Sequence, residues 1–229
     1  MAEYVVEFGK DGGRVESDGR LDAPAFHRNN HSIWAVLAEF LQDKSGQDKS
    51  GDVLEAGSGT GQHVVHFAER SPGITWWPSD YNGQHLKSIM AWRAHSNLPN
   101  IRAPFQIDLS DPNWASAMQR EGGPKELLAL FCANVVHIAP WPVAQGLFKG
   151  AGDLLRADGR FFLYGPFKRD GQHTALSNAV FDTSLREGNQ EWGVRDITDL
   201  EQLAARCGLA LREVKDMPAN NMILVFARA

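Results

Sequence analysis

One short glycine-rich stretch holds the residue types best suited to binding chemistry. It is Glu55-Ala-Gly57-Ser58-Gly59-Thr-Gly61. A turn with glycine at every second position takes backbone conformations that residues with a Cβ follow poorly. An apolar strand precedes the stretch and a helix is predicted from about Gly61, and the start of a helix presents free N–H groups and partial positive charge. A strand, a glycine turn and a helix start in this order predict a ligand-binding cradle.

The ligand of this cradle can be narrowed by elimination. A phosphate-binding P-loop needs Lys and then Ser or Thr after its last glycine, and Gln62 and His63 stand there instead. The dinucleotide fingerprint needs a small residue where Gln62 stands. What remains is E-x-G-x-G-x-G, the pattern of Rossmann-like methyltransferases that bind S-adenosylmethionine, whose α-carboxylate suits a helix N-terminus. The alternative is a glycine-rich turn that binds no ligand.

Carboxylates follow two later strands of the predicted sheet. Asp80 ends a strand over residues 74–80, where it can accept hydrogen bonds from both ribose hydroxyls of a nucleoside or cap the helix that follows. Asp108 ends a strand over residues 101–107, where it can accept from an adenine amino group. Because ligands of open α/β sheets bind outside the carboxyl ends of the strands, the two acids predict a nucleoside site beside the glycine turn.

Polar residues also follow the apolar strand predicted over residues 126–133, where a methyl acceptor would bind. Asn134 comes directly after this strand and His137 three residues later. Histidine is the side chain best suited to take a proton near neutral pH, so His137 is a candidate base or acceptor-orienting residue. The alternative is a histidine packed at the start of a helix.

Further side chains complete the candidate site. Tyr164 ends a strand, and His173 lies in the polar, turn-rich segment that follows, which is a candidate lid; either can contact the substrate. Arg28 either pairs with the methionine carboxylate of the cofactor or is an ordinary surface arginine.

His27 and His31 are four residues apart, but a metal site needs further ligands and no matching pair is evident. We therefore expect no metal.

Composition narrows the class of protein. The chain has 229 residues, 43% of them hydrophobic, and a net charge of −5 without a basic tract, which argues against a nucleic-acid partner. No apolar run approaches the ~18 residues that a membrane span needs, and the N-terminus lacks the regions of a signal peptide. We expect a cytoplasmic protein, a monomer or homodimer, with neither a membrane nor a nucleic acid as its partner.

Turn signals divide the chain into two parts. Residues 1–24 are predicted to be a hairpin or a flexible extension, with strands at residues 4–8 and 14–17. Residues 25–229 are predicted to form one methyltransferase domain.

Hydrophobic periodicity predicts the elements that position the candidate residues. Asn29 or Asn30 caps a first helix that ends near residue 42. The later helices are expected at residues 61–70, 82–96, 112–120, 142–156, 175–187 and 199–207, the last capped near Thr198. The later strands are expected at residues 160–164, 209–215 and 222–227.

Six groups of residues form a specific set that fold requirements alone do not explain. They are Glu55 to Gln62, Trp77-Pro-Ser-Asp80, Phe131-Cys-Ala-Asn134 with His137-Ile-Ala-Pro-Trp141, Tyr164-Gly-Pro-Phe-Lys-Arg-Asp-Gly171, Trp192-Gly-Val-Arg-Asp196 and Met217-Pro-Ala-Asn-Asn221. The set resembles the class I methyltransferases that use S-adenosylmethionine and, within them, the methyltransferase-like 26 family. The resemblance runs from about Ala25 to the end of the chain. It implies an α/β Rossmann-like fold, with a seven-stranded, mostly parallel sheet, helices on both faces and an antiparallel last strand.

The resemblance also implies roles for individual residues. Glu55 and the backbone from Gly57 to Gly61 would meet the methionine part of the cofactor, Asp80 the ribose and Asp108 the adenine end. Asn134, counted with the cofactor site, stands where amino-methylating enzymes carry N/D-P-P-Y/F. Here the sequence continues Val-Val-His, which weakens the case for a DNA or amide-nitrogen acceptor.

Two functions follow as hypotheses. The first is a methyltransferase that passes the methyl group of S-adenosylmethionine to a small molecule at sulfur, nitrogen or oxygen and leaves S-adenosylhomocysteine, with His137 and Tyr164 as its catalytic residues. Since the sulfonium already activates the methyl group, such an enzyme mainly aligns the two reactants. The second is a non-catalytic module that keeps the fold for protein interaction. The glycine spacing argues against a third hypothesis, an NAD-dependent enzyme.

Overall fold

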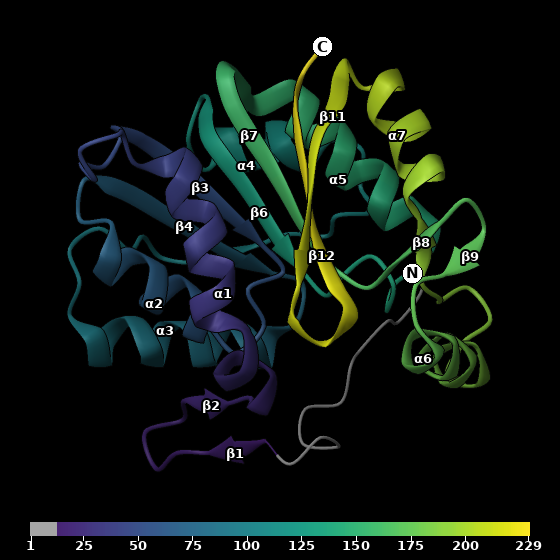
Figure 1. The fold of residues 1–229 in the computed structure, drawn as a ribbon. Helices are drawn as coiled ribbons and strands as arrows, with labels where there is room; N and C mark the ends of the chain where they lie inside the picture. Colours follow the sequence, from purple (N-terminus) through teal and green to yellow (C-terminus); the bar gives the residue numbers. More distant parts are fainter. Residues whose placement is uncertain (1–12) are drawn as a thin grey trace.

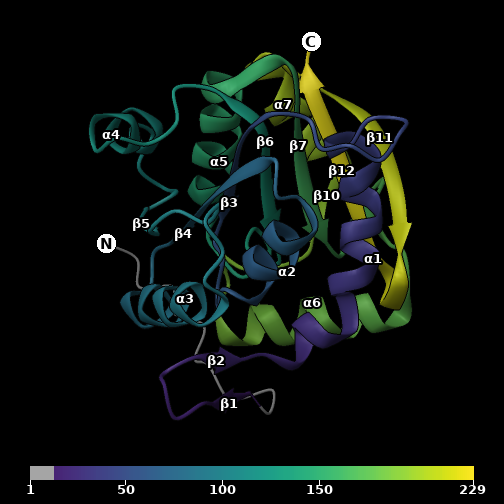
Figure 2. The ribbon, with the colours of Figure 1, turned by 90° about the vertical axis from the view of Figure 1, so that its left-hand side faces the viewer.

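Residues 13–229, the part of the chain that the computed structural model describes, are built around one seven-stranded sheet (Figures 1 and 2). Neighbouring strands pair in parallel from β7 to β5, whereas β12 is antiparallel to both β7 and β11. The predicted mostly parallel sheet with an antiparallel last strand is thus confirmed. In spatial order the strands are β11 (Leu209–Met217), β12 (Asn221–Arg228), β7 (Leu155–Gly165), β6 (Leu127–Ala133), β3 (Gly51–Ala56), β4 (Ile74–Asp80) and β5 (Phe105–Gln106).

Helices cover both faces of the sheet, as predicted (Figure 2). The apolar cluster under α1 and α2 contains Phe67 and Trp76, and the cluster under α4, α5 and α7 contains Trp114 and Phe148. All four side chains are at most 3% exposed, so each face of the sheet has its own dry core. The helices are α1 (Pro24–Leu41), α2 (Gln62–Arg70), α3 (Gly83–Ser96), α4 (Trp114–Arg120), α5 (Trp141–Leu154), α6 (Leu176–Gly188) and α7 (Ile197–Arg206).

The first helix begins five residues before Asn29 and six before Asn30, the two predicted caps. α1 starts at Pro24, and Asn29 and Asn30 are buried within it. Proline suits the first turn of a helix because its missing N–H would have no intrahelical partner there. The prediction of a cap at Asn29 or Asn30 was therefore wrong, and both amides are available for other contacts.

Two further boundaries differ from their predictions. The third strand was expected over residues 101–107, but only β5 is regular, with one isolated bridge from Ile101 to Trp76. Pro104 lies between these contacts, and proline cannot donate to a strand ladder. The cap of α7 is Asp196, whose side chain accepts from Thr198 N at 2.8 Å, so the cap lies near Thr198 as predicted and the helix begins two residues before the predicted start at Asp199.

The segment predicted as a lid has structure of its own. β8 (Phe167–Arg169) and β9 (Gln172–His173) form a hairpin, and β8 pairs in parallel with β10 (Arg195–Asp196). The β8–β9 hairpin lies between α7, above it, and α6, below it (Figure 1). The segment is therefore tied to the body of the protein on two sides.

The described N-terminal residues are also tied to the domain. β1 (Arg14–Val15) pairs with β2 (Leu21–Asp22), while the predicted strand at residues 4–8 lies outside the described residues. Leu21 N donates to Ser88 Oγ at 2.9 Å, and Ser88 Oγ donates to Thr60 O at 2.7 Å. The short hairpin thus contacts the glycine turn through one hydroxyl group. Within residues 13–229, no helix combines the length and apolar character needed to cross a bilayer.

Candidate functional site

The three glycines of the turn between β3 and α2 all have positive φ, at +73°, +56° and +89° for Gly57, Gly59 and Gly61. A Cβ on Gly61 would lie 2.9 Å from the Cα of Ile89, and one on Gly57 would lie 2.6 Å from Val135 Cγ2. A Cβ on Gly59 would meet nothing within 4 Å. Packing therefore explains Gly57 and Gly61, while Gly59 borders open space at the start of α2, where a ligand has room.

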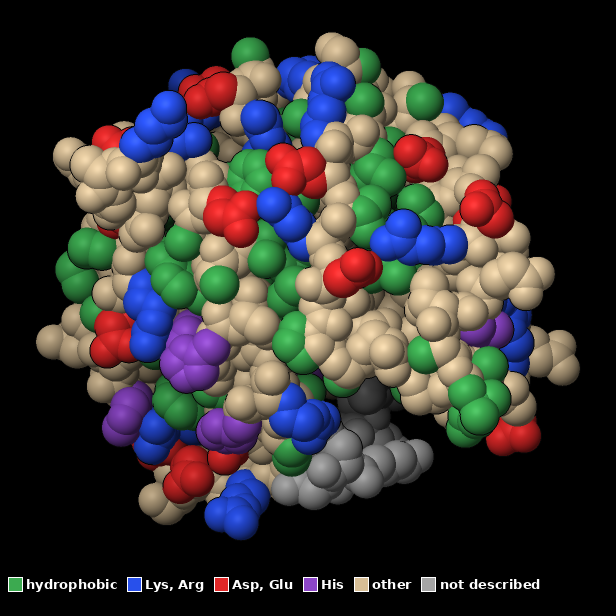
Figure 3. Space-filling model, viewed as in Figure 1, with side chains coloured by type: hydrophobic (Ala, Val, Ile, Leu, Met, Phe, Trp, Pro, Cys, Tyr) green, Lys and Arg blue, Asp and Glu red, His purple; other side chains and the backbone are tan. Residues whose placement is uncertain are grey.

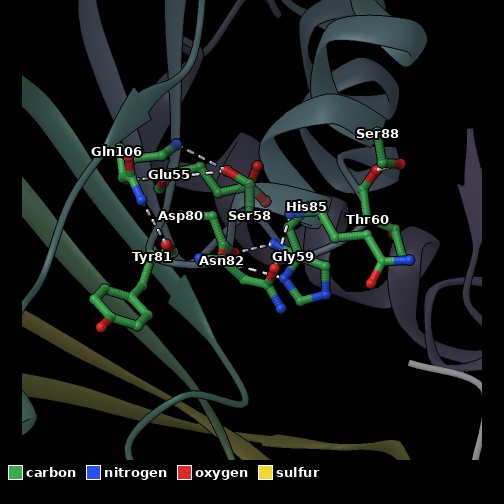
Figure 4. Close-up of polar contacts among 12 residues, drawn as sticks. Glu55, Ser58, Gly59, Thr60, Asp80, Tyr81, Asn82, His85, Ser88 and Gln106 are labelled. Atoms are coloured by element: carbon green, nitrogen blue, oxygen red, sulfur yellow. Dashed lines mark hydrogen bonds and ion pairs between the residues drawn. The ribbon is translucent and has the colours of Figure 1, made fainter. Parts of the chain in front are cut away.

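Asp80 lies directly against this turn (Figure 4). Its Oδ2 accepts from Gly59 N at 2.8 Å, and its Oδ1 accepts from Asn82 N at 2.8 Å and lies 3.2 Å from His85 Nδ1. The cap of α3 is Asn82, which accepts from Gln84 N at 2.8 Å, so the alternative cap role of Asp80 was wrong. A carboxylate has about four acceptor positions, and these contacts leave room for a ligand hydroxyl on Oδ2.

Glu55 is the most unusual acid of the site. It is 2% exposed, and its Oε2 has no hydrogen-bond partner. Its pKa is raised to about 8, mainly by burial and in part by the charge of Asp80, while a hydrogen bond with Ser58 opposes the shift. A buried carboxyl with an unpaired oxygen beside the glycine turn is suited to accept a hydrogen bond from a ligand.

Ser58 holds the turn together. Its N–H donates to Ser79 O at 2.8 Å, and its Oγ donates to Glu55 O at 3.2 Å. Ser79 Oγ donates to the same carbonyl at 2.9 Å. These bonds fasten the turn to β4, so the hydroxyl of Ser58 is engaged within the protein.

Asp108 follows the adjacent edge strand. The N–H of Ile107 donates to Asp80 O at 3.1 Å, which brings the two predicted nucleoside contacts to neighbouring strand ends. Asp108 Oδ1 accepts from Ser110 N at 2.9 Å and from Ser110 Oγ at 2.6 Å. Asp108 is thus held in a local turn at the place that the sequence predicted.

Tyr164 belongs to a buried polar chain that includes two residues missed by the sequence analysis. Its phenol has a hydrogen bond with the Asn29 side chain, and the Oδ1 of Asn29 lies 2.8 Å from His63 Nε2. Because an amide oxygen only accepts, this contact places the proton on His63 Nε2 and turns the Asn29 amide group toward Tyr164. Burial raises the pKa of Tyr164, while Asn29 and the nearby charge of exposed Arg28 lower it. Asn29 and His63 carry no sequence signal for this role, since they lie on different helices.

Asn134 and His137 approach each other at the end of β7. A Cβ on Gly165 would lie 3.2 Å from His137 Nδ1 and 3.8 Å from Asn134 Oδ1. His137 is 3% exposed, and its Nδ1 is buried without a partner. Burial, helped by the charge of Arg195, lowers the pKa of His137 to about 3. The imidazole is therefore neutral at neutral pH, able to orient a hydrogen-bonding partner but weak as a base.

The predicted residues thus form three groups around the carboxyl edge of the sheet. Glu55 and Asp80 lie at the glycine turn, with Asp108 at the neighbouring strand end. Val135 connects this group to the second group, Asn134 and His137, by packing on Gly57. Arg28 and Tyr164 make up the third group, with the chain to His63. His173 lies apart from all three, 3.3 Å from Asp182.

The two histidines weighed as a metal pair have separate partners. His27 Nε2 lies 2.6 Å from Asp22 Oδ1, and the ring of His31 packs edge-to-face on His66. Among residues 13–229, no three His, Cys, Asp or Glu side chains are grouped so that they could hold a metal ion.

Comparison with solved structures identifies the fold. The mitomycin 7-O-methyltransferase MmcR is 14% identical and matches 90% of this chain and 54% of its own, with a TM-score of 0.70. An O-methyltransferase family protein from Burkholderia thailandensis is 15% identical and matches 90% of this chain and 57% of its own, also at 0.70. CalO1, a methyltransferase of calicheamicin biosynthesis in its S-adenosylhomocysteine-bound form, is 15% identical and matches 86% and 54%, at 0.65. The chain spans only about half the length of these proteins, and the likeness establishes a class I methyltransferase fold.

A family assignment follows from the sequence as a whole. Residues 20–228 match the family described as "Protein of unknown function (DUF938)", which covers the described hairpin strand β2, the glycine turn and the entire sheet. The chain therefore belongs to the DUF938 family.

Proposed function

We propose that this protein is an S-adenosylmethionine-dependent methyltransferase that acts on a small-molecule acceptor at sulfur, nitrogen or oxygen. Two observations on the same turn carry the proposal: the buried Oε2 of Glu55 has no partner, and Gly59, four residues later, borders open space. A carboxyl acceptor, a free helix start and a second acid at the next strand end suit an amino-acid-bearing nucleoside. The fold likeness to methyltransferases, one of them bound to S-adenosylhomocysteine, supports the same reading.

The residues present fit this cofactor. The backbone from Gly57 to Gly61, with Arg28, would hold the methionine carboxylate, and Glu55 the ammonium group. Asp80 would accept from the ribose and Asp108 from the adenine amino group, with Asn134 closing the site beside the glycine turn. Ser58 would support the turn through its bonds to β3 and β4.

When bound, the cofactor supplies a methyl group that its positive sulfur already activates. The chain's own task is then to align the acceptor, which is worth up to about 7–11 kcal/mol in favourable cases. His137 is suited to orient the acceptor with a neutral ring nitrogen, and Tyr164 to hold a proton at its hydroxyl with the Asn29 amide group behind it. Because the pKa of His137 is lowered to about 3, we propose that the acceptor's proton leaves to solvent.

Finer features of the proposal come from the sequence. We propose that the chain is related to the methyltransferase-like 26 family, with residues 25–229 as the methyltransferase domain and residues 1–24 as its extension. We further propose a cytoplasmic monomer or homodimer that binds neither nucleic acid nor membranes. The net charge of −5 without a basic tract supports the absence of a nucleic-acid partner.

Isothermal titration with S-adenosylmethionine and S-adenosylhomocysteine tests the proposal. We expect saturable binding of both, and at least about tenfold weaker binding to Asp80→Ala, which loses the acceptor for the ribose. Folded wild-type protein that gives no heat with either compound would remove the proposal. Binding without turnover across a panel of thiols, phenols and amines would instead favour the non-catalytic module.

A further inference from the structure

Helix α6 is held against the body of the protein by one polar face. Asn178 Nδ2 donates to Asn220 O at 2.9 Å, and Asp182, one turn later, accepts from Val194 N at 2.7 Å and from Lys168 Nζ at 3.0 Å. Asn178 is 5% exposed and Asp182 is 6% exposed. Rolling the helix would leave these buried polar groups unpaired, at a cost of about 1–3 kcal/mol each. The remaining faces of α6 therefore have a fixed orientation.

Large apolar side chains gather on those remaining faces. Leu176, Val180 and Phe181 are 81%, 64% and 37% exposed. Among residues 13–229 only Val15 and Met90 are also large, hydrophobic and exposed, so most such side chains lie on one helix. Figure 3 shows hydrophobic side chains gathered over α6, at the lower right. Single exposed apolar residues need no explanation, but a group of them marks a binding surface.

One residue of this apolar surface, Phe181, contacts the candidate site. The ring of Phe181 packs edge-to-face on His137, with the ring centroids 5.6 Å apart. His137 Nδ1 is the buried nitrogen without a partner, and Asn134 Oδ1 approaches the same point beside Gly165. Phe181 therefore joins the apolar side chains of α6 to a polar end, formed by His137 and Asn134, at the edge of the sheet.

The charged groups around α6 are engaged on its other side. Lys168 and Arg186 both contact Asp182, at 3.0 Å and 3.3 Å. Arg195 donates to the carbonyl oxygens of Val136 and Ala139, at 2.9 Å and 2.6 Å. The three cations line a separate cavity of about 820 Å³ between β8 and α7. From residue 175 to residue 181 the helix carries no charged side chain, so a charged ligand would have no counter-ion on this surface.

We propose that Leu176, Val180 and Phe181 of α6, together with His137, bind the body of the methyl acceptor, which is an uncharged apolar or aromatic small molecule bearing a thiol or hydroxyl group. The inference rests on the proposed methyltransferase function. The apolar body lies along α6, and the thiol or hydroxyl group lies at the polar end formed by His137 and Asn134. Phe181 sets the width of the site and is its specificity-determining residue.

The test uses anisole, the methyl ether that such a reaction would leave on a plain aromatic ring. We measure its binding by saturation-transfer NMR with the full chain and saturating S-adenosylhomocysteine. Val180→Glu places a charge on an exposed position, and Gln190→Glu is the matched control, since it places the same charge on the exposed loop after α6. We expect anisole affinity to fall at least about fivefold in Val180→Glu and in Phe181→Ala, and to stay unchanged in Gln190→Glu. S-adenosylhomocysteine affinity should change less than about twofold in all three variants, because no altered residue belongs to the cofactor group.

The outcomes separate the two proposals. If S-adenosylhomocysteine does not bind the wild type, the proposed function fails. If it binds but anisole binds wild type and Val180→Glu equally, the proposed function stands and the acceptor surface is overturned. Benzylamine or phenyl phosphate binding as tightly as anisole would overturn the uncharged acceptor. A wild-type dimer that Val180→Glu dissociates in sedimentation analysis would make this surface a subunit interface and would also overturn the inference.

Discussion

The glycine turn and the His137–α6 region lie at the same edge of the sheet, but they are built in different ways. The turn is held by backbone conformation and by backbone donors, such as the bond from Gly59 N to Asp80 Oδ2. The region around His137 is held by side chains from distant segments, since Phe181 comes 44 residues later in the chain. A site made from backbone leaves its mark as glycine spacing, whereas a site made from packed side chains leaves little local pattern.

The sharpest test of this comparison lies within the turn itself. Gly61→Ala combines a positive φ with a Cβ that would lie 2.9 Å from the backbone of Ile89. We expect it to lower the free energy of unfolding by about 2–4 kcal/mol, from left-handed strain and overpacking together. Gly59→Ala is the matched control, because its φ is also positive but its Cβ meets nothing within 4 Å; it should cost about 1–2 kcal/mol.

Gly61→Ala should have the larger effect on stability, whereas Gly59→Ala should have the larger effect on the binding of S-adenosylhomocysteine. Gly59→Ala fills the space that we assign to the cofactor, so its affinity for S-adenosylhomocysteine should fall at least about tenfold in a folded protein. Urea denaturation and calorimetric titration measure the two effects separately. Equal stability of the two variants would contradict the packing role of Gly61, and unchanged binding by Gly59→Ala would contradict the ligand role of Gly59.

The same contrast explains how far the sequence could predict the molecule. The mostly parallel sheet with its antiparallel last strand was implied by the family resemblance, although the resemblance did not give the order of the strands. The approach of Asp80 to the glycine turn follows from the glycine spacing and from the acid at the end of the next strand. The start of α1 at Pro24 was missed because Asn29 and Asn30 are good caps in isolation, and only the tertiary contacts show them buried within the helix.

Contacts between distant side chains were beyond the sequence for the same reason. Asn29 and His63 face each other only because α1 and α2 pack on the same face of the sheet. Phe181 looked like one apolar residue among many in a predicted helix, and its contact with His137 depends on the polar anchor at Asp182. No spacing rule connects such pairs. Asn134 and His137 were predicted from the sequence as the acceptor side, but the contribution of α6 therefore had to come from the structure.

The buried carboxyl group of Glu55, on the cofactor side of the site, should make the stability of the protein depend on pH. Burial raises its pKa to about 8 in the folded protein, so folding favours the protonated carboxyl. An unperturbed glutamate has a pKa of 4.5. Below that pH the contribution of Glu55 to stability is fully present, and it is lost as the pH rises toward about 8. We expect the wild type to lose about 3–4 kcal/mol of unfolding free energy from about pH 5 to about pH 8. Glu55→Gln, which is neutral and similar in shape, should flatten this slope; an equal slope in both proteins would show that Glu55 is not the group responsible.

A smaller effect is expected for the buried chain from His63 to Tyr164. Tyr164→Phe removes one hydrogen bond and should cost about 1 kcal/mol, and Asn29→Ala removes two and should cost about 2–3 kcal/mol. Because both variants break the same contact, the double variant should be less destabilised than the sum by about 1 kcal/mol. Thermal and urea unfolding of the two single variants and the double variant measure this coupling. Ser45→Ala, in an exposed loop, is the control, since its effect should add to that of Tyr164→Phe. Additivity between Tyr164→Phe and Asn29→Ala would show that the chain does not act as a unit.

The smallest effect concerns His137, for which the structure predicts the absence of a titration. Burial and the charge of Arg195 lower its pKa to about 3, so the ring stays neutral from about pH 5 to about pH 8. We therefore expect no pH dependence of kcat/KM in this range that is due to His137. The pH profiles of wild type and His137→Gln should have the same shape. The same variant should reduce kcat/KM by less than about tenfold, because an amide can still orient a hydroxyl or thiol group but cannot act as a base. If kcat/KM of the wild type changes with pH in this range and His137→Gln abolishes that change, His137 is a titrating base. The burial seen here would then have to be relieved when the acceptor binds.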